Sequence, residues 1–135
     1  MRTRIAAVAM VAAGIAALTA GPATAATATG EVDTATCLTV LNQPCISHQA
    51  QGDGFIGVAQ VSADPSQLTL VQVEIRTQKA WGSPWETVAT GTTVKLGSAK
   101  AVTPKVSTID LKMVCATAGP ALDKSKQVTT CGYPF

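Results

Sequence analysis

The fold is decided by residues 68–78, which read LTLVQVEIRTQ. Apolar side chains at positions 71, 73 and 75 alternate there with polar side chains at positions 72, 74 and 76. A period of two places successive side chains on opposite faces of a strand, whereas a helix repeats every three to four residues. The stretch therefore predicts a β-strand with one buried face and one solvent-facing face.

Strand signals continue on both sides of this stretch, with turn signals between them. Valine and threonine are frequent, and no segment beyond residue 25 has helical spacing. In the last long strand we expect Ile109, Leu111, Met113 and Cys115 to share one face, opposite Asp110 and Lys112. The strands are predicted within 37–45 and at 55–61, 68–78, 86–90, 92–96, 106–117 and 127–131, with loops at 49–54, 64–66, 97–104 and 118–126. The sequence thus predicts an all-β fold, a small antiparallel β-sandwich of about seven strands.

The chain begins with the features of an export signal. Basic residues at positions 2 and 4 precede an uncharged apolar run from Ile5 to about Ala20, and residues 21–25 read GPATA. A basic head, an apolar middle and an Ala-x-Ala end are typical of a secretory signal peptide. The run is shorter than the roughly 20 apolar residues that span a bilayer, so a membrane anchor is less favoured. We expect a signal peptide over 1–25, with a cut after Ala25 or, alternatively, Ala28, a flexible N-terminal segment over 26–36 and a single secreted, extracellular domain over 37–135.

Removal of the signal leaves a chain without net charge. Arg76 and seven lysines balance eight acids, because the formal +2 of the full sequence belongs to Arg2 and Arg4. No basic stripe marks a nucleic-acid surface, and no later apolar run is long enough to span a membrane. The 110 remaining residues fit one domain, of a size whose stability gains from cross-links.

Four cysteines supply candidates for such cross-links. An even number of cysteines in an exported chain favours disulfides, and their spacing does not match a zinc site, so we expect two disulfides and neither metal nor cofactor. Of the three pairings, we predict Cys37–Cys45 and Cys115–Cys131. The first closes a short loop that contains Pro44, and the second faces across an antiparallel hairpin centred near Asp123.

Residues 71–131 resemble the second half of immunoglobulin-like or fibronectin-like secreted domains. The resemblance rests on the alternating strand, the tryptophan-containing stretch followed by Glu86–Gly91, the strand that carries Cys115 and the closing hairpin. It implies fold alone, since these folds host many functions. The cysteines depart from the antibody pattern, which has a tryptophan between an inter-sheet pair. The alanine- and threonine-rich composition and the style of the signal resemble exported proteins of high-GC actinobacteria.

No pattern in the sequence indicates a catalytic centre. His48 is the single histidine; neighbouring side chains on a strand point to opposite faces, so Ser47 is poorly placed for it, and we expect a solvent-facing loop histidine. Glu74 and Glu86 are the carboxylates that could meet as a glycosidase pair, yet both fall at polar, outward positions. Residues 52–54 read GDG but lack the further ligands of a calcium loop, which favours a turn. We predict that the protein is not an enzyme.

Aromatic residues are the best candidates for binding. Trp81 and Trp85 flank a turn, and exposed aromatic rings stack on sugars or anchor protein interfaces. Core packing of at least one of the two is the commoner outcome in a domain of this kind. Tyr133 and Phe135 follow Cys131 and are expected to cover an end of the sandwich, with Tyr133 as a third candidate binding residue.

These observations favour a small secreted binding protein without catalytic activity. The expected partner is an extracellular polysaccharide, the cell envelope or another protein. The alternative is an inhibitor of a secreted hydrolase such as a protease. A cross-linked loop loses little entropy on binding an enzyme, and the candidate loops are residues 42–44 and 119–126.

Overall fold

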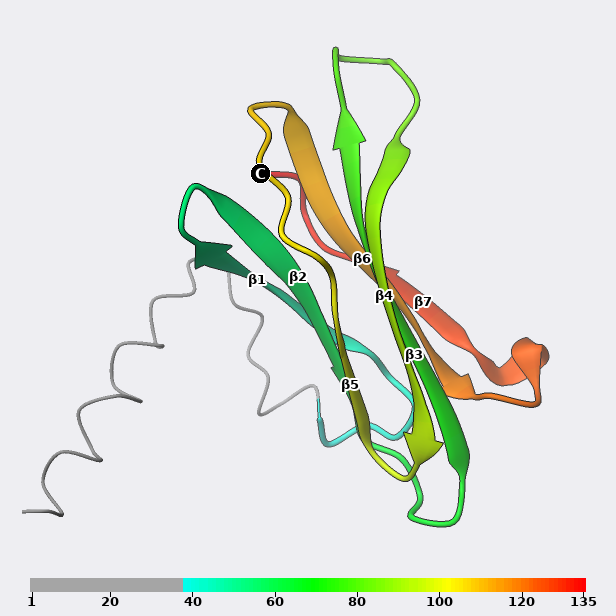
Figure 1. The fold of residues 1–135 in the computed structure, drawn as a ribbon. Coiled ribbons are helices and arrows are strands. Elements are labelled where there is room, and N and C mark those ends of the chain that lie inside the picture. Colours follow the sequence, from blue (N-terminus) through cyan, green and yellow to red (C-terminus); the bar gives the residue numbers. More distant parts are fainter. Residues whose placement is uncertain (1–37) are drawn as a thin grey trace, which may run out of the picture.

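The computed structural model describes residues 38–135, which form a two-layer sandwich of antiparallel strands (Figure 1). A three-stranded sheet has the order β1-β2-β5, and a four-stranded sheet has the order β4-β3-β6-β7. A short 3₁₀ helix, Lys124–Lys126, precedes the last strand. The seven strands are β1 Cys45–Gln51, β2 Gly54–Val61, β3 Leu68–Gln78, β4 Glu86–Leu96, β5 Ala99–Val102, β6 Leu111–Pro120 and β7 Val128–Cys131. The prediction of seven strands in an all-β sandwich is confirmed, although individual strands differ.

Strand β3 lies at the centre of the larger sheet and is the strand that the sequence predicted best. Its bounds match the predicted 68–78, and burial alternates along it, with Val71, Val73 and Ile75 fully buried. These side chains meet small apolar residues of the opposite sheet, including Ala59 and Ala101. Burial of apolar surface between the two sheets is the main stabilising term of such a fold.

Strands β4 and β5 differ from the prediction. Residues 86–96 form one strand instead of two, and a short strand, β5, occupies the predicted loop 97–104. Gly91, expected to separate two strands, pairs with Val73 in the middle of β4. A Cβ atom at this position would collide with the carbonyl group of Val102 in β5. Glycine is therefore present because another backbone approaches closely, and the strand continues through it.

Strand β6 is shorter than predicted and has the opposite face buried. Residues 106–110 precede it, and Ile109 is fully exposed. The core receives Val114, Ala116 and Ala118, whereas Met113 and Cys115 lie on the outer face of the sheet, beside Arg76 and Glu74 of β3. Both faces of β6 carry apolar residues, so alternation alone did not identify the buried one.

The beginning of the described chain also corrects the prediction. Residues 38–44 form turns instead of a strand, and β1 begins at Cys45 and runs through part of the predicted loop 49–54. The predicted signal peptide and N-terminal segment, residues 1–36, lie outside the described residues, as does Cys37.

Candidate functional site

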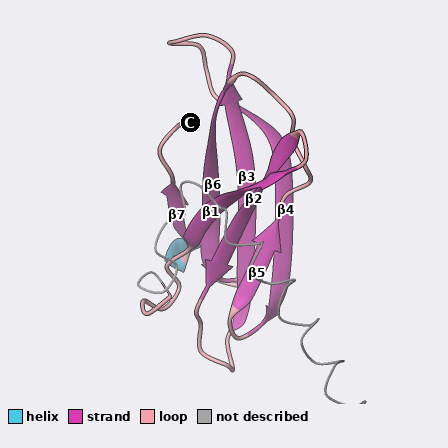
Figure 2. Ribbon diagram, turned by 90° about the vertical axis from the view of Figure 1, so that its left-hand side faces the viewer, coloured by secondary structure: helices cyan, strands magenta, loops and turns pink. Residues whose placement is uncertain are grey.

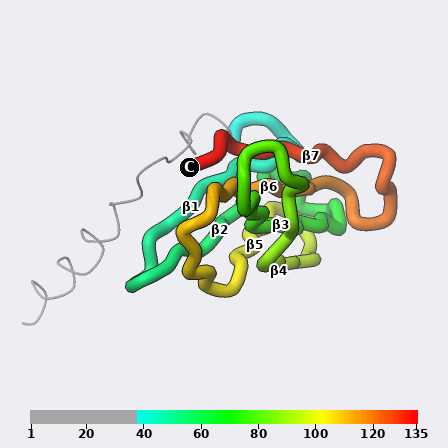
Figure 3. The backbone as a smooth tube through the Cα atoms, turned by 90° about the horizontal axis from the view of Figure 1, so that it is seen from above, coloured from blue at the N-terminus to red at the C-terminus, as the bar shows by residue number. Residues whose placement is uncertain are grey.

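A groove opens between the two sheets at the edge formed by β1 and the C-terminal segment. Its volume is about 480 Å³, within the range of roughly 300–1,000 Å³ that is typical of ligand pockets. Its walls come from the start of β1, from β6 and from the chain that follows β7, and its apolar and aromatic lining includes Pro44, Ile46, Val114, Tyr133, Pro134 and Phe135. Figure 3, which looks down on the sandwich, shows the red C-terminal segment beside β1.

Backbone hydrogen bonds hold the C-terminal wall of the groove in place. The Gly132 N–H donates to the carbonyl of Val114 at 2.9 Å. Phe135 and Lys112 exchange two bonds, of 2.9 and 3.2 Å. The residues after β7 thus continue to pair with β6 and give the groove a fixed side.

Aromatic contacts join this segment to the three-stranded sheet. The Phe135 ring stacks on His48 of β1 at 3.8 Å between ring centroids and 13° between planes. It also meets the ring of Phe55 edge-on at 5.6 Å. The Lys112 ammonium lies 5.2 Å from the centroids of both phenylalanine rings, a cation–π geometry. Two members of this cluster, His48 and Phe135, line the groove.

His48 therefore differs from the expected loop histidine, because it lies in a strand and is partly buried. Ile46 and His48 face the core side of β1, whereas Ser47 faces the opposite side, so Ser47 and His48 form no catalytic pair. The sequence signal for the stacking of His48 was the pair of aromatic residues after Cys131. Their contact with β1 could not be predicted, because it forms only in the folded chain.

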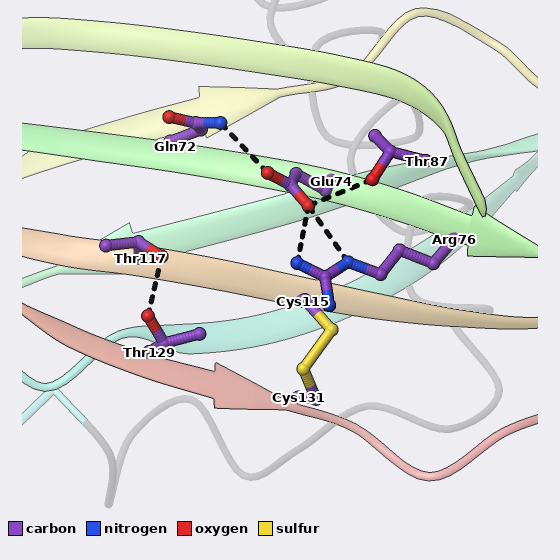
Figure 4. A network of polar contacts seen from close by, with 8 residues as sticks. All are labelled: Gln72, Glu74, Arg76, Thr87, Cys115, Thr117, Thr129 and Cys131. Carbon is purple, nitrogen blue, oxygen red and sulfur yellow. Dashed lines mark hydrogen bonds and ion pairs between the residues drawn. A yellow bond between two sulfur atoms is a disulfide. The ribbon is translucent and has the colours of Figure 1, made fainter. Parts of the chain in front are cut away.

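The two candidate acids each have a separate polar partner. Glu74 accepts hydrogen bonds from Arg76, Gln72 and Thr87 on the outer face of the larger sheet (Figure 4). Glu86 lies 3.3 Å from the Lys79 ammonium. A glycosidase pair consists of two carboxyl groups that face each other across a cleft, whereas each of these two acids is bound to a cationic side chain of its own.

The disulfide between Cys115 and Cys131 forms as predicted. The two residues face each other across the β6–β7 hairpin, with Cα atoms 4.0 Å apart. Figure 4 shows it on the outer face of the sheet, near the hydrogen bond between Thr117 and Thr129. No cysteine within residues 38–135 is free. The pairing of Cys45 with Cys37 stays a prediction because Cys37 lies outside this range.

The aromatic candidates lie in different surroundings from those expected. Trp81 is 94% exposed in the β3–β4 connection, and Trp85 is partly buried and outside the core cluster, so the expected core packing of a tryptophan is wrong. Tyr133 is 95% exposed and lines the groove. Figure 1 shows the β3–β4 connection and the C-terminus at the same end of the sandwich. Trp81 and Tyr133 are therefore both presented to solvent, one in the β3–β4 connection and the other in the segment after β7.

The GDG sequence at 52–54 forms the turn between β1 and β2, as predicted. The Asp53 carboxylate binds the Lys105 ammonium at 2.6 Å, and this hydrogen bond lowers the pKa of Asp53. In the part of the chain that the structure describes, no three His, Cys, Asp or Glu side chains are grouped as metal ligands would be.

Comparisons with protein families, curated proteins and solved structures find no match to this chain. None of the helices within residues 38–135 has the length and apolar character needed to cross a membrane.

Proposed function

We propose that the protein is a small secreted, non-catalytic binding protein that holds a protein partner in the groove beside β1. The observation that carries this proposal is the groove itself, an open, mainly apolar cavity of about 480 Å³ with an exposed tyrosine in its wall. Apolar pockets with a few polar groups are the usual form of binding sites in proteins.

We further propose an immunoglobulin-like fold of the fibronectin type. The strand orders β1-β2-β5 and β4-β3-β6-β7 support it, because the fourth strand lies beside the third on the four-stranded sheet. In domains of this architecture the loops cluster at the two ends of the sandwich, and in antibody variable domains the loops of one end bind the ligand. The fold supports a binding scaffold without naming the ligand.

The chemistry of the lining favours a protein partner over a polysaccharide. Sugars need many hydrogen-bonding groups beside an aromatic platform, and the polar side chains of the groove are few. One of them, Gln43, already donates to Thr130 at 3.1 Å. An apolar or aromatic side chain of a partner would bury its surface against Ile46, Val114 and Tyr133 at about 25 cal/mol per Å².

Selection from a display library of random short peptides tests this proposal. Peptides selected on the mature chain should lose about tenfold in affinity when Tyr133 is replaced by Ser, because exposed aromatic anchors dominate such interfaces. Ile109→Ser is the matched control, since Ile109 is equally exposed and lies outside the groove. Peptides that bind the Tyr133→Ser variant unchanged, or retention on cellulose, chitin or peptidoglycan in place of peptides, would contradict the proposal.

The alternative of a hydrolase inhibitor has weaker support. Inhibitory loops protrude, but Pro44 is buried, Gln43 is half-buried and Asn42 donates its backbone N–H to Ser62 at 2.8 Å. The 119–126 turn is more exposed, with Leu122 at 89%. A panel of secreted proteases assayed at micromolar protein decides this alternative, since inhibition of one of them would support it over the groove.

A further inference from the structure

Strand β4 forms one edge of the four-stranded sheet and is the longest edge strand within residues 38–135. It has 11 residues, whereas the other edge strands, β1, β5 and β7, have 7, 4 and 4. Figure 2 shows β4 and β7 at opposite edges of the larger sheet. Natural proteins protect exposed strand edges with proline, charges, bulges or short length. β4 contains no proline, its charged residues are Glu86 and Lys95, and its bulge lies near its beginning.

The backbone of β4 directs every second residue away from the rest of the sheet. The Gly97 N–H donates to the carbonyl of Gln67 at 2.9 Å, and the same register continues along β3 and β4. In an antiparallel pair, alternate residues bond to the neighbouring strand. Thr90, Thr92 and Val94 therefore turn their backbone N–H and carbonyl groups toward the edge. Among the backbone hydrogen bonds that the loops of residues 38–135 make, none reaches these groups.

The side chains along this edge are open to solvent on the outer face of the sheet. Thr90 and Thr92 are exposed, and Val94 and Leu96 are 50% and 64% exposed. The smaller sheet approaches β4 from the core side, where a Cβ atom at Gly91 would meet Val102. The outer side of β4 therefore stays accessible to another strand.

We propose that two copies of this chain pair through β4, antiparallel to each other about a two-fold axis at Gly91. Gly91 is the middle residue of β4, so the two strands overlap over their whole length. Thr90 of one copy then lies opposite Thr92 of the other. Both residues turn their backbone groups to the edge, so they exchange hydrogen bonds across the axis. The two four-stranded sheets become one continuous sheet.

The charges of β4 are complementary in this arrangement. Val88 is the extra residue of the bulge, because Ala89 pairs with Ile75 and Thr87 pairs with Arg76. Beyond Val88 the register between the two copies shifts by one residue, and this shift brings Glu86 opposite Lys95 of the other copy.

The side chains of Glu86 and Lys95 also lie on the same face of the sheet. Their partners on β3 are Thr77 and Thr69, which are both buried on the core side. The two-fold axis therefore creates the Glu86–Lys95 ion pair twice.

Both charged groups can take part in this contact. Lys95 belongs to none of the ion pairs within residues 38–135. Glu86 lies 3.3 Å from the Lys79 ammonium, but both side chains of that pair are more than half exposed. A second copy supplies both the matching strand and the matching charges, which favours it over an unrelated extended peptide. The groove lies along β1 and the segment after β7, away from β4, so each copy keeps its own groove.

Sedimentation of the oxidised mature chain at micromolar to submillimolar concentrations tests the proposal. The natural chain should change from monomer to dimer as its concentration rises. Thr92→Pro should raise the dissociation constant about tenfold, because it removes a hydrogen-bond donor from both copies. It removes no bond to β3, and proline is tolerated at such edge positions. Thr129→Pro is the matched control, since Thr129 is exposed on β7 at the opposite edge of the same sheet.

Charge reversal tests the same pairing if Thr92→Pro fails to fold. Lys95→Glu or Glu86→Lys alone should weaken the dimer about threefold or more, because like charges then face each other. An equimolar mixture of the two variants should recover the affinity, since opposite charges face each other again in the mixed dimer.

Three results would overturn the proposal. A natural chain that sediments as a monomer at every concentration lacks this interface. A dimer that Thr92→Pro and both charge reversals leave unchanged forms through another surface, and a dimer that Tyr133→Ser abolishes forms through the groove. Peptide binding by the groove is measured separately, so the proposed function stands or fails independently of the dimer.

Discussion

Replacement of Gly91 by alanine tests the close approach of β4 and β5. The added methyl group would point into the sandwich, collide with the carbonyl group of Val102 and lie 3.1 Å from the Thr103 nitrogen. These are backbone atoms, and two hydrogen bonds hold them in place: the Thr103 N–H donates to the carbonyl of Gly57 at 3.0 Å, and the Gly57 N–H donates to the Thr103 hydroxyl at 2.9 Å. Neither strand can therefore yield by moving a flexible side chain.

The expected change in the free energy of unfolding for Gly91→Ala is the difference between two opposing effects. In an ordinary strand, alanine is about 0.5–1 kcal/mol more stable than glycine. Overpacking costs about 1–3 kcal/mol, and a collision with backbone belongs at the upper end of that range. We expect Gly91→Ala to lower the free energy of unfolding by about 2 kcal/mol, which corresponds to a fall of about 8–16 °C in melting temperature for a domain of this size.

Thermal unfolding of the oxidised mature chain, followed by far-ultraviolet circular dichroism, measures this shift. Thr92→Ala is the control, because Thr92 is the next residue of β4 and is exposed. A surface substitution of this kind stays within about 0.5 kcal/mol. An unchanged or higher melting temperature for Gly91→Ala would refute the close approach, since it is the behaviour of a glycine in an ordinary strand.

Three further predictions concern the disulfide, the buried Thr103 hydroxyl and the Asp123 carboxylate. Joint replacement of Cys115 and Cys131 by alanine should lower the free energy of unfolding by about 3 kcal/mol, since the bond closes a loop with a sequence separation of 16; an unchanged urea midpoint would contradict this. Thr103→Val leaves the Gly57 N–H without its side-chain acceptor and should cost about 1–3 kcal/mol. Thr103→Ser should restore most of that stability, so equal losses in the two variants would argue against the hydrogen bond. A hydrogen bond from the Ser125 hydroxyl is the main cause that lowers the pKa of Asp123 below its ordinary value of 3.8. The resulting stabilisation is present above about pH 4 and is lost as the pH falls through the lowered pKa. The natural chain should therefore have a higher free energy of unfolding than Asp123→Asn near neutral pH, and this difference should vanish in acid. A difference that does not change with pH would exclude the Ser125 hydrogen bond as its cause.

The central strand was predictable because one of its faces is apolar and the other polar. Strand β5 gave no such signal: it has four residues, and Gly97, Ser98 and Pro104 near its ends are typical of loops. In β6, the alanines at positions 116 and 118 face the core, whereas the larger Leu111 and Met113 face outward. Small side chains fill the narrow space between the sheets, and hydrophobicity alone could not reveal this preference for size.

The groove could not be predicted, because its walls come from opposite parts of the sequence. Ile46 and His48 of β1 meet Phe135 only after both sheets have formed. The pairing of Cys115 with Cys131 was predictable because it depends on one hairpin. Exposure of Trp81 was not, since a tryptophan beside a turn suits either a core or a surface position.

The two long edges of the sandwich differ in how firmly the sheets are joined. At one edge β4 passes into β5 through two residues, so the covalent chain ties the sheets together. At the other edge, noncovalent contacts of Phe135 with His48 and Phe55 join the C-terminal segment to the smaller sheet. Local opening needs least free energy where few contacts must break. We therefore expect the two sheets to separate first at the edge that holds the groove, while the β4–β5 connection keeps them together at the other edge. Such an opening would widen the groove without unfolding the core.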